Sequence, residues 1–416
     1  MLSAFRSSKP FFGQTCKLGN LAKENSMQGN RSVETTKQSK WREAIALALS
    51  LVCCQAAFAA EEERSVFVDP EDGYVDASEW LLDKQGFLPV PMIITEPAVG
   101  YGGGFAFLFF RESLREAAEG SKDKGHVTPP DIFGGALAAT ENGTKAAGVG
   151  GLFSFADDRW RYRGVLGNAN INLDFYGSGN TSSPKLGYNL NGWMSSQQAL
   201  RRFGESDNFV ALRWIFLDLD NTLETGLLQP PLIDTPRNVR SSGLGVSFEH
   251  DSRNNFFTAS RGWLGRITSM FYSPEIGSDQ KYQIYGASVF GYVPYKTLVF
   301  GGRLDGRTAS GDVPLYQLPY IDLRGIPAAR YQGKDIAVAE TELRWNVSPR
   351  WALVGFVGAG RAWGDRVDFS DADTEVSGGA GFRYLIARRL GLFAGIDVAR
   401  GPEEGAIYLQ FGSAWR

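Results

Sequence analysis

From residue 87 to the C-terminus, apolar positions alternate with polar or small ones in segments of about ten residues, separated by turn signals. In the last segment one parity is apolar or aromatic and contains Ile407, Leu409, Phe411 and Trp415. In residues 336–346 a polar parity appears instead, made by Glu340, Glu342 and Arg344. The two-residue period continues without a convincing helical stretch, which favours a large β-barrel over a soluble sandwich.

The pattern predicts about sixteen strands. Fifteen lie near residues 98–110, 131–141, 145–155, 160–176, 185–203, 208–219, 239–249, 261–273, 279–294, 297–310, 334–346, 350–363, 374–385, 389–399 and 405–415. Residues 87–94, FLPVPMII, supply the sixteenth, because single-chain bacterial barrels have an even number of strands. Most short turns then fall at one end and long connections at the other, although residues 111–130 depart from this rule. The predicted fold class is all-β, a transmembrane antiparallel β-barrel with a short N-terminal periplasmic segment.

The N-terminal region predicts export. Residues 40–59 resemble a secretory signal, with a basic flank, an apolar run and a small-x-small cleavage site that ends at Ala59. The first 26 residues are unusual for a signal, which favours Met27 as the true start. We therefore divide the chain into a targeting region with the signal peptide (1–59), a short periplasmic tether (60–86) and an outer-membrane barrel (87–416).

The predicted tether is acidic and polar apart from one short amphipathic stretch. In DASEWLLDKQG, Asp76 and Glu79 have the spacing of a capping box, and Gly86 is a stop signal, which predicts one small helix. We interpret these residues as a link that precedes the barrel. A helix that enters the barrel lumen is the alternative.

Composition excludes several classes of function. A net charge of −3 gives no basic bias toward nucleic acid, and only two histidines are present, which leaves little scope for a His-based metal centre or a Ser-His-Asp triad. All three cysteines precede Ala59, so the exported chain needs no disulfide. No later segment has the roughly 18 apolar residues that a membrane helix needs. Export and alternation together indicate a membrane barrel, and we expect no cofactor and no bound metal.

One motif points to a different class of protein. WIFLDLDNTLETG, residues 214–226, resembles the nucleophile motif of haloacid-dehalogenase-type phosphatases, in which the first Asp, here Asp218, attacks a phosphoryl group. Such an enzyme needs helices between parallel strands downstream. The residues after Asp220 form a polar loop and more Gly-rich alternation, so we interpret both Asp residues as water-facing at a strand end. The chain is then not an enzyme, and the phosphatase is kept as a remote alternative.

Three ordered stretches resemble one known family. They are HDSRNNFFTASRGWLGRI (250–267), YIDLRGIPAARYQGKDIAVAETELRW (320–345) and GAGFRYLIARRLGLFAGIDVARGPEEGAIYLQFGSAW (379–415). They are similar to the Asp-x-Arg turn, the Val-Arg-Gly-(Phe/Tyr) loop and the C-terminal strands of the BamA/TamA-type outer-membrane barrels, the bacterial surface antigen superfamily. The resemblance implies a sixteen-stranded barrel that assembles or translocates proteins. Full members carry periplasmic POTRA repeats, and residues 60–86 are shorter than one repeat.

The resemblance also implies a site in the lumen. The tip of a long outer loop folds back into the barrel and carries the family motif, here Leu323, Arg324, Gly325 and Ile326. A guanidinium in a partly dry lumen needs a carboxylate. Many members provide an Asp where this chain has Gly358. We therefore expect Arg324 to pair with Glu342, and we keep Glu340 and Asp397 as further candidates.

The barrel must close between its first and last strands. Pro89 and Pro91 stand two apart in the expected first strand, so one edge of it lacks two consecutive N–H donors. We expect a short, weakly paired seam between residues 87–94 and the strand that ends at Trp415.

These observations lead to one functional hypothesis and one alternative. The hypothesis is an integral barrel of the bacterial outer membrane, exported with a cleaved signal peptide, with a role in protein insertion, secretion or membrane biogenesis. Its expected partners are the lipid bilayer and unfolded outer-membrane or secreted proteins, with no nucleic acid. The alternative on the same fold is a passive pore or structural surface antigen.

Overall fold

The computed structural model describes residues 66–116, 119, 129–176, 185–224, 237–365 and 367–415. All of them belong to one compact unit that begins at residue 65. The expected signal peptide, the start at Met27, the cleavage after Ala59 and all three cysteines lie outside the described residues. The long 225–236 connection and most of residues 117–128 also lie outside them.

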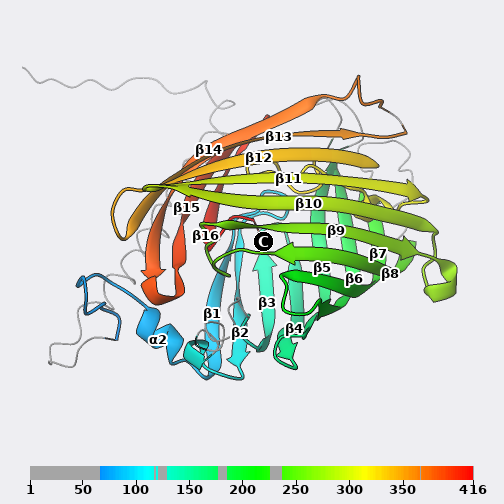
Figure 1. Cartoon of the computed structure of the whole chain (residues 1–416). Coiled ribbons are helices and arrows are strands. Elements are labelled where there is room, and N and C mark those ends of the chain that lie inside the picture. Colours follow the sequence, from blue (N-terminus) through cyan, green and yellow to red (C-terminus); the bar gives the residue numbers. More distant parts are fainter. Residues whose placement is uncertain are drawn as a thin grey trace, which may run out of the picture. The chain divides into compact units, whose positions relative to one another are not determined.

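A single sheet of sixteen strands forms this unit, and each strand pairs antiparallel with the next in the chain (Figure 1). The strands are β1 (Gly86–Ile94), β2 (Gly102–Phe110), β3 (Ile132–Thr140), β4 (Lys145–Phe155), β5 (Trp160–Tyr176), β6 (Lys185–Arg202), β7 (Asn208–Glu224), β8 (Arg237–Asp251), β9 (Gly262–Tyr272), β10 (Tyr282–Tyr295), β11 (Leu298–Gly311), β12 (Asp335–Asn346), β13 (Trp351–Trp363), β14 (Thr374–Ala387), β15 (Leu392–Arg400) and β16 (Gly405–Phe411). The predicted fold class and strand number are confirmed, including the assignment of the first strand to FLPVPMII.

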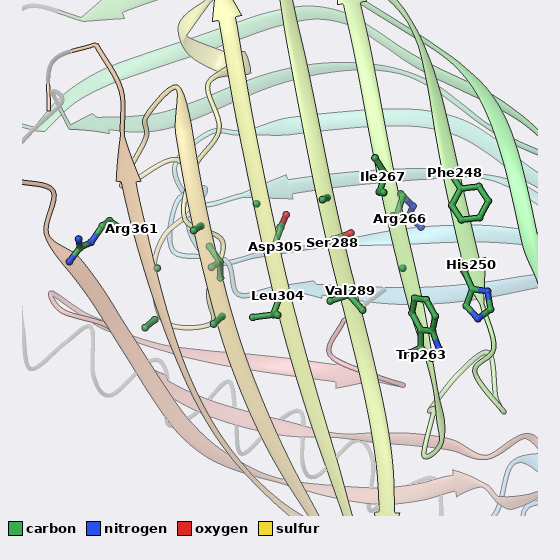
Figure 2. A pocket seen from close by; sticks show the side chains of 18 of the residues that line it. Phe248, His250, Trp263, Arg266, Ile267, Ser288, Val289, Leu304, Asp305 and Arg361 are labelled. Atoms are coloured by element: carbon green, nitrogen blue, oxygen red, sulfur yellow. The ribbon is translucent and has the colours of Figure 1, made fainter. Parts of the chain in front are cut away.

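Side chains alternate between the lumen and the outside as the sequence pattern predicts. Along β12, Ile336, Val338 and Glu340 are buried, whereas Leu343 and Trp345 are exposed on the outer face. Backbone pairing satisfies the polar groups of the wall, so the outer face is free to be apolar. An apolar groove of about 710 Å³ crosses that face from β8 to β13, and its lining includes Phe248, Trp263, Ile267, Val289 and Leu304 (Figure 2).

Strand length varies strongly around the sheet. β5, β6 and β7 have 17, 18 and 17 residues. β1, β2, β3 and β15 have 9 residues each, and β16 has 7. The short strands are therefore gathered on the two sides of the position where the sheet begins and ends.

Short helical segments accompany the strands. They are the helix α2 (Ser78–Leu82) and the 3-10 turns η1 (Pro274–Ile276), η2 (Leu315–Gln317) and η3 (Arg388–Leu390). In the described part of the chain, no helix has the length and apolar character that crossing a membrane requires. We call the barrel end with the turns after β12 and β14 the short-turn end, and the opposite end the long-loop end.

Candidate functional site: a lumen loop and an unpaired strand junction

The connection between β11 and β12, residues 312–334, is called here the long loop, and its tip carries Arg324. The Arg324 side chain is 9% exposed and lies among three carboxylates. Its Nε donates to Glu340 Oε1 at 2.9 Å, and its Nη1 donates to Asp397 Oδ2 at 3.0 Å. Nη1 also lies 2.8 Å from Glu342 Oε2 as an ion pair. The guanidinium carbon stacks on the ring of Phe356, 3.5 Å from its centroid.

The structure thus brings Arg324 together with all three carboxylates named from the sequence. Glu340 is the principal partner rather than Glu342, because both Nε and Nη2 of Arg324 approach Glu340 Oε1. Glu340 and Asp397 are 2% and 0% exposed, and a carboxylate so deeply buried needs a fixed cation. Asp397 also accepts two hydrogen bonds from Arg383, at 2.6 and 2.9 Å.

The residues beside Arg324 explain how the loop is held. Leu323 and Ile326 are 3% exposed and belong to a buried cluster with Ile336 and Val338 of β12. Gly358 makes room for this packing, because a Cβ there would lie 2.6 Å from Leu323 Cδ2. In this chain the position is therefore used for apolar packing.

Gly325 is required by its backbone. It has a φ of +92°, which favours glycine, and a Cβ would lie 2.9 Å from the backbone of the β15–β16 turn. Its N–H donates to the hydroxyl of Tyr408 in β16 at 2.9 Å. The loop tip is thereby tied to the last strand as well as to β12.

The C-terminal segment, residues 412–415, differs from the prediction. The alternation predicts a last strand that continues to Trp415 on the parity of Ile407, but β16 ends at Phe411. Gly412 has a φ of +79° and turns the chain out of the sheet, and a Cβ there would lie 2.4 Å from Phe257 O. Trp415 is 5% exposed and lies inside the barrel, where its Nε1 donates to Glu340 Oε2 at 2.7 Å.

No ladder joins β1 to β16 in the described residues. Pairing of β1 with β2 runs without interruption from Gly86 to Ile94. Proline has no N–H and cannot donate a hydrogen bond to β2. Because the register with β2 is unbroken, the nitrogens of Pro89 and Pro91 must face the other edge of β1, on the side of the junction. The expected weak seam is therefore an unpaired junction in this structure, and Trp415 takes no part in it as a strand residue.

Residues 66–83, which we call the strap, lie at the short-turn end. Arg350, in the turn between β12 and β13, is 1% exposed and is surrounded by three strap carboxylates. Its Nη2 donates to Asp69 Oδ2 at 2.6 Å, its Nε donates to Asp72 Oδ2 at 2.6 Å, and its Nη1 donates to Asp76. Arg388 of η3 adds a hydrogen bond to Asp69 at 2.5 Å. The strap is therefore attached by charge to the turns after β12 and β14.

These hydrogen bonds lower the pKa values of the strap carboxyl groups. The hydrogen bond from Arg388 lowers the pKa of Asp69, and the one from Arg350 lowers the pKa of Asp72. Burial alone would raise the pKa of Asp76, but the bonds from Arg350 and Ser78 outweigh it and the pKa is lowered. The carboxylates are consequently held in the charged form.

The predicted capping box is wrong. The N-cap of α2 is Ala77, which makes no side-chain cap. Asp76 accepts the N–H of Ser78 at 2.5 Å with one oxygen and binds Arg350 with the other. Glu79 does not turn back to Asp76 but pairs with Arg389 at 2.5 Å. Contacts with the barrel thus replace the capping interactions that the sequence predicts. The helix ends at Leu82, and Gly86 is the first residue of β1 rather than a helix stop.

An apolar cluster continues the attachment of the strap across the junction. Its buried members are Leu82 of α2, Leu88 of β1, Phe110 of β2, Leu114, Ala387 of β14 and Leu390 of η3. It therefore includes strands from both sides of the unpaired junction. Side-chain packing at the short-turn end takes the place of the missing ladder.

The long loop makes a similar connection at the opposite end. The N–H of Ala328 donates to Glu96, just after β1, at 3.1 Å. Arg330 is 3% exposed and pairs with Glu403 in the turn between β15 and β16. The two sides of the junction are therefore linked through one loop here as well.

Asp218 and Asp220 of the phosphatase-like motif are strand residues that share one hydrogen-bond donor. They lie within β7, near its long-loop end, and β7 pairs antiparallel with both neighbours. Both accept hydrogen bonds from Asn238 Nδ2, at 3.0 and 3.1 Å. Across the described ranges of the chain, no group of three or more His, Cys, Asp or Glu side chains is arranged so that it could hold a metal ion.

Sequence reasoning missed the strap and its central residue, Arg350. The acidic composition of residues 60–86 was visible, but a carboxylate run usually faces water. No local signal links it to an Arg located 274 to 281 positions later.

No family model and no curated protein matches this chain by sequence. Solved structures do match. The crystal structure of BamA from Haemophilus ducreyi lacking POTRA domains 1–3 is similar with a TM-score of 0.54 and 13% identity, over 79% of this chain and 70% of that one. CdiB from Escherichia coli gives 0.51 and 10%, over 78% of this chain and 61% of that one. CdiB from Acinetobacter baumannii gives 0.51 and 11%, over 78% and 59%.

The fold and the loop site together define a class. The chain is a sixteen-stranded antiparallel barrel whose lumen holds an inward-folded loop with a buried arginine. It has the fold of the BamA-type barrels, as the resemblance of the loop and C-terminal strands implied. It spans less than two thirds of the length of the two CdiB chains.

Proposed function

We propose that this protein is an integral barrel of the bacterial outer membrane that inserts, secretes or assembles other proteins. The observation that carries the proposal is the β1–β16 junction, which is unpaired in a sheet that is otherwise continuous. An unpaired strand edge presents free N–H and C=O groups and is a template for another strand. Strand addition at such an edge is a general mode of protein recognition.

The two edges of the junction are unequal. The free edge of β1 lacks donors at Pro89 and Pro91, whereas β16, GAIYLQF, contains no proline. An incoming strand therefore finds more donors along β16 than along β1. Proline also protects β1 against indiscriminate pairing with other chains.

The contents of the lumen support this proposal over a passive pore. The loop tip at Arg324 and the ring of Trp415 both occupy the barrel interior and are bonded to Glu340. A wide, steady channel requires an interior free of such plugs. The pore remains the second candidate, because a cavity of about 440 Å³ stays open beside these residues.

Comparative proteomics of the outer membrane tests the proposal. Cells with and without the protein are compared, and depletion should lower the amounts of particular outer-membrane or secreted proteins. Re-expression of the wild-type protein should restore them, whereas Arg324→Ala should not. Arg361→Ala, on the outer face of β13, is the matched control and should restore them fully.

Bilayer recordings separate the two candidates. The proposal predicts that the purified protein gives no large, steady conductance. An unchanged proteome after depletion, together with a large conductance, would overturn the assembly role and establish the pore.

A further inference from the structure

A cavity of about 440 Å³ lies inside the barrel, between strands β7 to β12, the long loop and the C-terminal segment. Its charged lining is mostly basic and consists of Arg213, Arg266, Arg303, Arg307 and Arg324, with Asp305, Asp322 and Glu340. Ile215, Met270, Ile284 and Phe290 give it an apolar part. The cavity therefore combines cationic groups with apolar surface.

The charges near the loop are balanced. Arg303 and Arg307 share Asp305, at 3.1 and 2.8 Å, and Arg303 also contacts Asp322 at 3.1 Å. Arg324 contacts three carboxylates, of which it shares Asp397 with Arg383 and Glu340 with Arg303. These cations need no further partner.

The charges on β5 to β9 are not balanced. Arg163 and Arg266 both use Glu249, at 3.1 and 2.9 Å. Arg213 has no carboxylate within ion-pair distance among the described residues; its one hydrogen bond is to Ser196 Oγ at 3.4 Å, and its buried Nε has no partner. Arg163 and Arg266 thus share one carboxylate and Arg213 has none, so these three guanidinium groups carry two more positive charges than their partners compensate.

The strand register explains why these charges gather. Arg163 of β5 lies opposite Gln198 of β6, which lies opposite Arg213 of β7. The next position in that row is Gly245, which carries no side chain and so cannot supply an acceptor. Arg213 therefore lines the lumen cavity with its buried Nε unpartnered and with one long hydrogen bond to Ser196 Oγ.

We propose that this cavity binds a small organic anion, with its carboxylate or phosphate on Arg213 and its apolar part on the Met270 side. A guanidinium keeps its charge at every physiological pH, so Arg213 cannot become neutral by losing a proton, and its charge needs an anionic partner. Water hydrates it but does not neutralise it. The planar fork matches a carboxylate or phosphate in a bidentate manner. This inference does not depend on the proposed function.

Calorimetry on the purified, detergent-folded protein tests the inference, with benzoate and phenyl phosphate as probes and benzamide as the neutral counterpart of benzoate. We expect saturable binding of both anions and none of benzamide. Arg213→Gln should weaken benzoate binding at least tenfold, and Arg213→Lys, which keeps the charge and loses the fork, should weaken it less. Arg361→Gln should leave it unchanged.

Stability gives an independent readout. Arg213→Gln removes an unpaired charge, so it should fold to the same heat-resistant extent as the wild-type protein, and benzoate should raise the melting temperature of the wild-type protein only. Absence of saturable anion binding, or equal binding by Arg213→Gln, would overturn the proposal. A misfolded Arg213→Gln would show that Arg213 has a structural partner and would overturn it too.

Discussion

The wall from β5 to β8 and the junction between β1 and β16 are held together by different kinds of interaction. In the wall, long strands pair by backbone hydrogen bonds along their whole length. At the junction no ladder exists in the described residues, and the strap and the long loop connect the two sides through side chains. Backbone ladders tolerate most substitutions and changes of pH. Contacts between charged side chains are sensitive to both. We therefore expect single substitutions or a change of pH to disrupt the junction before they disrupt the wall.

Acid should produce the largest difference between the two regions. The pKa values of Asp69, Asp72 and Asp76 are lowered in the folded state from an ordinary value of 3.8. Their stabilisation is therefore complete above pH 3.8 and is lost as the pH falls through their lower folded values. Hydrogen exchange, corrected for intrinsic rates, should show loss of protection in the strap below pH 3.8 while β5 to β7 stay protected. Simultaneous loss in both regions would contradict the comparison.

Arg350→Ala should release the strap at neutral pH. It leaves Asp69, Asp72 and Asp76 with only Arg388 nearby, and removal of one partner from a buried ion cluster costs about 3–5 kcal/mol. We expect a lower urea midpoint for the folded barrel and loss of exchange protection in the strap. Arg361→Ala, whose partners Thr374 and Phe369 O are more exposed, is the control and should change stability by less than about 1 kcal/mol. Equal effects of the two variants would refute the central role of Arg350.

Arg324→Ala should weaken the lumen side of the junction by a smaller amount. Asp397 retains Arg383, and Glu340 retains Trp415, so we expect a loss of about 1.5–3 kcal/mol, the range for hydrogen bonds to charged groups. The heat-resistant fraction on cold gels and the amount folded in the membrane should fall. A double-mutant cycle with Glu340→Gln should give a larger coupling than one with Glu342→Gln. The reverse order would show that Glu342 is the principal partner.

Replacing Pro89 and Pro91 together by valine should have the smallest effect on stability. The new N–H groups face an edge that has no partner strand, so the free energy of unfolding should change by less than about 1 kcal/mol. Edge pairing between molecules should rise instead, and it can be measured as detergent-resistant dimers after cross-linking. A large gain in stability with no dimers would mean that β1 and β16 had formed a ladder.

Much of the fold could be predicted from the sequence, because a two-residue period fixes both strand identity and the facing of side chains. That period placed Glu340, Glu342 and Asp397 in the lumen, and the structure brings them to Arg324. The prediction from this period is wrong at the end of the last strand. Trp415 continues the parity of Phe411 in the sequence, but Gly412 turns the chain out of the sheet and into the lumen. The contacts of the strap could not be predicted for another reason. Their partners lie far along the chain, and only the folded barrel places Arg350 beside Asp69.

The unequal strand lengths also have a consequence for the surrounding lipid. At about 3.3 Å per residue and a tilt of about 45°, the 18 residues of β6 rise about 42 Å, whereas the 7 residues of β16 rise only about 16 Å. A hydrocarbon layer is about 30 Å thick. The bilayer beside β16 must therefore compress or tilt its acyl chains to cover the short wall, at a cost of fractions of a kcal/mol per Å. We therefore expect lipid order to be lowest beside the unpaired junction, and under the proposed function a segment that crosses the membrane there would meet a lower barrier than beside β6.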